Sequence, residues 1–119
     1  LLYNNLLFSL AAGVGKYNGG GIQQLPQSVA DDGLLDITLI KPLHWWHVIF
    51  RLRRLFNGEI YSIGHVQHLQ GSKIRIESSP EIDLEIDGEL HGGTPVELRV
   101  LHRAVKVIVN KSFIDKLKA

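Results

Sequence analysis

Cysteine and methionine are both absent from this sequence of 119 residues. The lack of cysteine excludes disulfide bonds and thiolate metal sites. Long apolar runs are also lacking, because the longest one, residues 6–14, contains Ser9 and Gly13. It is far shorter than the ~20 residues that a membrane-spanning helix requires. No signal segment is recognisable either, so we expect a soluble, cytoplasmic chain.

An excess of charge of one sign is lacking as well. The formal net charge is +1, which is too small a bias to predict nucleic acid as a partner. The length predicts one domain that folds alone. A start at Leu1 without any methionine indicates a segment of a longer protein.

Short segments of alternating polarity predict a mainly β fold. In residues 34–40, Leu35, Ile37 and Leu39 alternate with polar Asp36 and Thr38, which predicts two different faces. The strands that we expect cover residues 6–12, 34–40, 72–78, 81–87, 96–101 and 104–109. Helical spacing predicts a single substantial helix over residues 43–56, ended by Asn57-Gly58. Several short strands with a single helix favour an antiparallel β-sandwich or barrel.

The stretch "GVGKYNGGGIQQLP", residues 13–26, resembles a phosphate-binding loop at first sight. A Walker loop needs Ser or Thr after Gly-Lys, but Tyr17 follows Lys16 here. A dinucleotide-binding loop must open a helix, and the following Ile-Gln-Gln-Leu-Pro does not favour one. We therefore expect the run at residues 19–21 to mark a bulge or a close backbone approach in a β-rich domain.

Half of the twelve acidic residues fall between Glu77 and Glu89. Lys73 and Arg75 on the preceding strand predict a hairpin through Ser79-Pro80 with charges paired across it. Asp87 and Glu89 lie instead where a strand meets the loop-forming "HGGTP". Two carboxylates there can act as a base and an orienting group, or can simply be charges at a turn.

The segment "VADDGLLD", residues 29–36, is not an EF-hand, because the position of the bidentate Glu is occupied by Pro42. Two interpretations are left: a plain Asp-Gly turn, or a magnesium site formed by Asp32 and neighbouring carbonyl groups.

The segment "LHWWHVIFRLRRLF" combines tryptophans with arginines. It is predicted either to pack on a sheet with its arginines in water, or to lie at a membrane surface. His44 and His47 share a helical face but lack a third metal ligand nearby.

Several motifs, in this order, resemble the carboxyl-terminal half of the diacylglycerol kinase catalytic family, which includes bacterial lipid kinases and is related to the sphingosine kinases. They are "GKYNGGGIQQLP", "ADDGLLDITLI", "LEIDGEL", "PVELRV" and "AVKVIV". The resemblance covers nearly the whole chain. It implies that residues 1–119 form the antiparallel β-sandwich, with one helix, that is the second domain of a two-domain lipid kinase. The ATP-binding glycines would then belong to an amino-terminal domain absent from this sequence, and residues 19–21 would match a strand of the sandwich.

The resemblance also implies site residues. The family's "DGE" motif falls on Asp87, Gly88 and Glu89, with Glu89 as the general base and Asp87 orienting the hydroxyl or helping to hold magnesium. The structural Mg²⁺ site of the bacterial members falls on the Val29 carbonyl, the Asp32 side chain and the Leu34 carbonyl.

The implied activity is ATP-dependent transfer of the γ-phosphoryl group to a lipid hydroxyl of the diacylglycerol type. Magnesium is the expected cofactor, ATP the co-substrate and a lipid the substrate, with peripheral membrane contact. The isolated segment is expected to be inactive because it has no ATP loop. A non-catalytic β-sandwich binding module is the alternative, and the lipid and a homodimer are left open.

Overall fold

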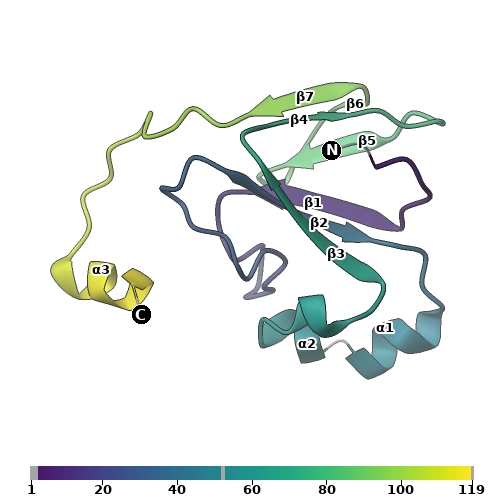
Figure 1. Ribbon diagram of the computed structural model, residues 1–119, viewed down its shortest axis with the longest axis horizontal. Coiled ribbons are helices and arrows are strands. Elements are labelled where there is room, and N and C mark those ends of the chain that lie inside the picture. The colour runs from purple at the N-terminus through teal and green to yellow at the C-terminus, as the bar shows by residue number, and fades with distance from the viewer. Residues whose placement is uncertain (1–2, 52, 119) are drawn as a thin grey trace.

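The computed structural model describes residues 3–51 and 53–118 and consists mostly of antiparallel strands. Three of them form one sheet in the order β1-β2-β3, with β1 at Ser9–Gly13, β2 at Leu35–Ile40 and β3 at Val66–Gly71. Figure 1 shows this sheet crossing the middle of the molecule. The antiparallel, mainly β class predicted from the sequence is confirmed.

Two further sheets, each a ribbon of two antiparallel strands, lie on the upper side of this sheet in Figure 1. In the first, β4, Lys73–Ile76, pairs with β7, Val96–Arg99; in the second, β5, Asp83–Ile86, pairs with β6, Glu89–Gly93. A groove between the sheet and β4 is lined by apolar side chains of both, among them Leu10, Leu39, Leu69 and Ile74. The layers therefore have the arrangement of a sandwich.

Strand β2 is the centre of the domain. Among its residues Ile37 and Leu39 are buried, and they belong to the core together with Leu25, Ile60 and Ile63. Asp36 and Thr38 are buried too, although their alternation predicts an opposite and more polar face. A central strand that is covered on both faces buries both sets of side chains. The alternation of polar and apolar residues along such a strand therefore does not predict which side chains are exposed.

The predicted helix over residues 43–56 is present as α1, Trp45–Arg51, and α2, Arg53–Phe56. The expected end is confirmed, because Gly58 has a φ of 77°, which suits the residue that follows a helix. A short 3-10 helix, Ile60–Ser62, comes next. The prediction of a single helix is wrong, since α3 occupies Lys111–Lys118. Within the described residues, no helix is long and apolar enough to cross a bilayer.

The predicted hairpin through Ser79-Pro80 is wrong. Strand β4 pairs with β7, and Lys73 accordingly forms its ion pair with Glu97, at 3.1 Å, across those two strands. Strand β5 pairs with β6 through the tight Asp87-Gly88 turn, which closes a hairpin with fewer residues than the Ser-Pro connection. The acidic strand thus gains no cross-strand partner from Lys73.

Residues 104–109 form no strand, contrary to the prediction. The described residues offer them no neighbouring strand, and an unpaired strand leaves its backbone N–H and C=O groups without partners. Val105, Val107 and Ile108 are consequently exposed. Figure 1 shows this segment as an extended connection from the ribbons to α3.

The glycine run at residues 19–21 forms a turn between Asn18 and Ile22, whose backbones are bridged. The Asn18 N–H donates to the Ile22 carbonyl at 2.8 Å. Apart from its chain neighbours, no heavy atom lies within 4 Å of a Cβ built on Gly19, Gly20 or Gly21. The run is therefore an exposed turn, and the interpretations as a close backbone approach and as a strand are wrong.

Candidate active site

Asp87 and Gly88 form the two-residue turn that joins β5 to β6. Both residues have positive φ, 51° and 87°, as a type I′ turn requires, and Asp-Gly is among the sequences that favour this turn. The register places Ile86 opposite Glu89, so Glu89 is the first residue of β6. The turn therefore places Asp87 and Glu89 at one end of the β5–β6 pair.

The Glu89 side chain is 82% exposed, and an imidazole lies near it. Its Oε2 is 3.7 Å from Nε2 of His91, which is two residues further along the same strand and on the same face. His91, Gly92 and Gly93 continue β6, so the prediction of "HGGTP" as a loop-forming stretch is wrong for these three residues. An exposed carboxylate on a fixed backbone can accept a proton from a hydroxyl brought within hydrogen-bond reach.

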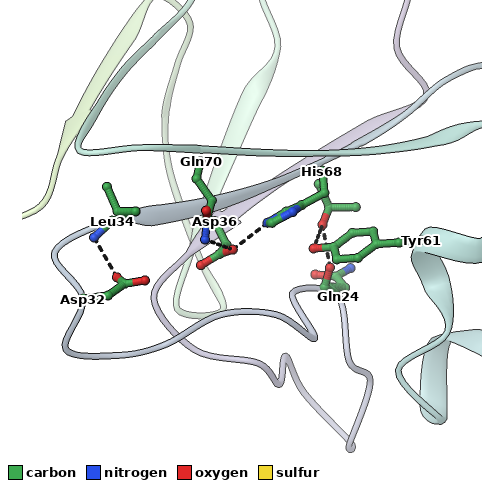
Figure 2. Close-up of polar contacts among 8 residues, drawn as sticks. Gln24, Asp32, Leu34, Asp36, Tyr61, His68 and Gln70 are labelled. Carbon is green, nitrogen blue, oxygen red and sulfur yellow. Dashed lines mark hydrogen bonds and ion pairs between the residues drawn. The ribbon is translucent and has the colours of Figure 1, made fainter.

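The predicted metal loop is an Asx turn. The Leu34 N–H donates to Asp32 Oδ1 at 2.8 Å, as Figure 2 shows, and the Asp32 N–H donates to the Val29 carbonyl at 3.4 Å. Gly33 has a φ of 80°, which glycine adopts at little cost. A Cβ at Gly33 would come within 2.8 Å of Nδ1 of His102, so the loop also packs closely against the connection to α3.

The oxygen atoms proposed as metal ligands in this loop are of the kind that magnesium prefers. Two backbone carbonyls, of Val29 and Leu34, and one carboxylate, of Asp32, are hard oxygen ligands within a six-residue segment. Among the residues that the structure describes, no group of three or more His, Asp or Glu side chains is suited to hold a metal. An ion at this loop would therefore depend on carbonyl groups and on water.

A buried polar network in the three-stranded sheet was not foreseen from the sequence (Figure 2). Asp36 is fully buried on β2, and its Oδ1 accepts hydrogen bonds from two side chains of β3. His68 Nε2 lies at 2.6 Å and Gln70 Nε2 at 3.0 Å from that oxygen. The other carboxylate oxygen, Oδ2, has no hydrogen-bond partner among the described residues.

The network continues to Tyr61, in the short 3-10 helix. Its ring stacks on His68 with ring centroids 4.7 Å apart, and its hydroxyl lies 3.0 Å from Oγ1 of Thr38. Since the Thr38 hydroxyl donates to the Gln24 carbonyl at 2.6 Å, Tyr61 is the donor to Thr38. Burial raises the pKa of Tyr61 above its ordinary value of 10.0, and the charge of Asp36 adds to this effect.

One sequence signal points to this network: two polar residues, Asp36 and Thr38, stand between the apolar residues of a strand. Their partners could not be found from local pattern, because His68 and Gln70 face them only through the β2–β3 register. The network contains neither Asp32 nor Glu89.

Residues 5–109 match one family model, that of the YegS C-terminal NAD kinase beta sandwich-like domain. The matched range contains β1 to β7, the Asp87-Gly88 turn and the predicted metal loop. The chain belongs to this family.

Curated relatives of this YegS-type domain have similar sequences. A Bacillus subtilis protein named diacylglycerol kinase is 26% identical over 99 residues, which is 82% of this chain and 33% of the relative. A Pseudomonas savastanoi protein named as a probable lipid kinase of the YegS-like type is 29% identical over 101 residues, which is 85% of this chain and 32% of the relative. The chain thus spans about a third of the length of these relatives.

A solved structure agrees with the family assignment. It is that of a Bacillus anthracis protein described as a "putative diacylglycerol kinase", with a TM-score of 0.61 and 27% sequence identity. The likeness covers 78% of this chain and 30% of the other. The recognition from sequence motifs is confirmed: the chain is a YegS-type C-terminal domain whose relatives are named as lipid kinases.

Within this YegS-type domain the two predicted sites are separate. Asp87 and Glu89 lie on the β5–β6 ribbon, whereas the loop of Val29, Asp32 and Leu34 precedes β2. Among the described residues, no hydrogen bond or ion pair joins Asp32 to Asp87 or Glu89. The roles given to these five residues stay predictions.

Proposed function

We propose that this chain is part of an ATP-dependent lipid kinase that transfers the γ-phosphoryl group to the hydroxyl of a lipid of the diacylglycerol type. Family membership and the names of its relatives support the class of enzyme. The position of Glu89 carries the assignment of the base, because the Asp87-Gly88 turn presents its carboxylate to solvent at the start of β6.

In the proposed reaction, Glu89 accepts the proton of the lipid hydroxyl as its oxygen bonds to the γ-phosphorus. The bond between that phosphorus and the bridging oxygen breaks, and ADP leaves with the electron pair. Asp87, two residues before Glu89, would orient the hydroxyl or contribute an oxygen ligand to a catalytic metal ion. Positioning and charge neutralisation provide most of the acceleration in phosphoryl transfer.

Magnesium would supply charge neutralisation at the phosphates and, at the loop before β2, a structural cross-link. The Val29 carbonyl, the Asp32 carboxylate and the Leu34 carbonyl would hold the structural ion. That loop is already bent by the Asp32–Leu34 hydrogen bond and by Gly33. We assign this ion a role in the conformation of the loop and no role in the chemical step.

Substitution of Glu89 in the full-length protein tests the proposed base. Glu89→Gln should preserve folding and ATP affinity and lower turnover by roughly 10² to 10⁴, the usual contribution of a positioned base. Glu85→Gln is the matched control, because Glu85 is exposed on β5 of the same ribbon. Turnover is measured as transfer of radiolabel from ATP to a panel of lipid hydroxyls. Normal turnover of Glu89→Gln would contradict its role as base.

Two further outcomes bear on the enzyme itself. A full-length protein that labels no lipid of the panel would contradict the kinase and favour a binding module. The isolated 119 residues should label none, because a phosphate-binding loop is lacking: Gly15-Lys16 is followed by Tyr17. Phosphorylation by this segment alone would contradict the assignment of ATP binding to another part of the protein.

A further inference from the structure

The connection that follows β7 packs against the predicted metal loop, residues 29–34. A Cβ built on Gly33 would lie 2.8 Å from Nδ1 of His102, 3.3 Å from its Cγ and 3.5 Å from its Cε1. The ring atom nearest to this Cβ position is therefore a nitrogen. Gly33 stands between Asp32 and Leu34, two of the three residues that are proposed to hold the ion. The contact thus brings a nitrogen donor from a distant part of the sequence to this loop.

A turn in an uncommon backbone conformation places His102 at this loop. The Ala104 N–H donates to the Leu101 carbonyl at 3.2 Å, which makes His102 and Arg103 the two central residues of the turn. Arg103 has a φ of 54°, one of two positive values among the non-glycine residues that the structure describes. Such a conformation is costly for a residue with a side chain, and it is often found where a functional site requires it. The strained turn therefore points to a role for the residue that it presents, His102.

The imidazole of His102 is free to bind a ligand. Among the described residues, the histidine side chains engaged in hydrogen bonds or ion pairs are those of His68 and His91. His102 is exposed and has neither kind of contact there. Asp32 is exposed as well, and within the same residues its Oδ1 alone accepts a hydrogen bond, from the Leu34 N–H. A carboxylate oxygen and an imidazole nitrogen are thus both available at one loop.

We propose that His102 is a further ligand of the divalent metal ion at this loop and binds it through an imidazole nitrogen. The inference rests on the metal site of the proposed function and adds to it a residue from outside the loop. Carbonyl and carboxylate oxygens suit magnesium, whereas imidazole suits transition metals. A set of one nitrogen and several oxygens should therefore bind a transition-metal ion such as Co²⁺ more tightly than it binds Mg²⁺.

This ligand would make the metal ion a cross-link between two segments of the chain. The loop leads into β2, the central strand of the sheet, and the connection that contains His102 leads to α3. Residues 104–109 of that connection pair with no strand among the described residues. An ion held from both sides would therefore fix the start of the connection against the domain, beside the contact at Gly33.

Electron spin-echo spectroscopy of Mn²⁺ bound to the full-length protein tests this ligand, because a directly bound imidazole nitrogen modulates the echo. The wild type with equimolar Mn²⁺ and no nucleotide should show the nitrogen modulation. His102→Gln should lose it and should bind Mn²⁺ roughly tenfold more weakly or worse, since even residues that only support a metal ligand contribute that much. The ratio of Co²⁺ affinity to Mg²⁺ affinity should fall in the same variant.

Two control variants locate the ion. Asp32→Asn should lose both the tight binding and the nitrogen modulation, because it removes the charged ligand of the loop. His91→Gln should keep both, since His91 lies on β6 beside Glu89 and would report an ion held at the β5–β6 turn instead. In EDTA the thermal midpoint of His102→Gln should be close to that of the wild type, because the His102 side chain is exposed.

Three results would overturn the role of His102. They are tight Mn²⁺ binding without nitrogen modulation in the wild type, modulation that survives in His102→Gln, and modulation that His91→Gln abolishes. The first of these, with binding that Asp32→Asn removes, would keep the loop site of the proposed function. Binding that Asp32→Asn does not weaken would contradict that site together with the role of His102. Kinase activity is measured separately, so its loss or presence leaves these outcomes unchanged.

Discussion

The carboxylate of Asp36 and the imidazole of His68 are held 2.6 Å apart inside the sheet, although 32 residues separate them in the sequence. Asp36 is fully buried, so hydrogen bonds within the protein must replace those to water, and among the described residues Oδ1 receives them. Gln70 provides a second hydrogen bond to the same oxygen. These contacts join the central strand β2 to β3 through side chains as well as through the backbone.

Replacing Asp36 by alanine should destabilise the domain. The change removes the acceptor of half-buried His68 and of Gln70, and the loss of a hydrogen bond costs about 0.5 to 1.5 kcal/mol. The thermal midpoint of the full-length protein should fall clearly, as measured by calorimetry. Asp83→Ala is the control, because Asp83 is an exposed acidic residue of β5. Equal shifts in the two variants would contradict a structural role for the Asp36–His68 contact.

Tyr61 should make stability decrease at alkaline pH. Its pKa is raised by burial and by Asp36, so the unfolded chain loses the phenol proton first as pH rises. The stabilisation is therefore complete below pH 10.0, the ordinary tyrosine value, and is lost as pH rises through the higher pKa of the folded state. Urea unfolding at a series of pH values should show this decrease.

The variant Tyr61→Phe should show a weaker decrease of stability above pH 10.0 than the wild type. At neutral pH it should cost about 0.5 to 1.5 kcal/mol, the worth of the hydrogen bond to Thr38. Tyr17→Phe is a suitable control because Tyr17 is exposed. An identical alkaline decrease in wild type and Tyr61→Phe would exclude Tyr61 as its source.

The Asp87-Gly88 turn should be sensitive to a single methyl group. Gly88 has a φ of 87°, and apart from its chain neighbours no heavy atom lies within 4 Å of the position of a Cβ, so alanine there meets mainly backbone strain. Gly88→Ala should cost about 1 to 2 kcal/mol and lower turnover by displacing Glu89. Gly20→Ala, at a glycine with open space and no positive φ, should do neither. The comparison is made by calorimetry and by lipid phosphorylation.

Asp32 permits a test that separates the metal from the turn. Asparagine keeps an oxygen to accept the Leu34 N–H but removes the charge that magnesium requires. Magnesium should raise the thermal midpoint of the full-length wild type, and EDTA should reverse this. Asp32→Asn should lose the magnesium response and match the wild type in EDTA, whereas Asp31→Asn should respond normally. A normal magnesium response of Asp32→Asn would exclude a metal site at this loop.

Local sequence patterns predicted elements whose causes are local. The strands expected at residues 34–40 and 96–101 are present as β2 and β7, and the helix ends at Asn57-Gly58. Alternation, helical spacing and turn residues act within a few positions of the chain, so they can be read without knowing the neighbours. The turn at Asp87-Gly88 is equally local, and it positions Glu89.

Strand pairing was not predictable in the same way. The segment 104–109 has the composition of a strand, but a strand needs a partner for its backbone groups and none is available among the described residues. The two segments on either side of Ser79-Pro80 both form strands, but they do not pair with each other. Strand β4 pairs with β7, and β5 pairs with β6. Pairing depends on which edges meet, and that is a property of the whole fold.

The sequence by itself therefore determined the β-rich class, most strand positions, the turn before Glu89 and the motifs that indicate the family. Only the tertiary structure decided that Asp36 is buried beside His68 and that the tryptophans of α1 face outward. Burial depends on what covers a residue, and the covering groups come from distant parts of the chain. A period along the chain marks the faces of a strand or helix but does not say which of them is covered.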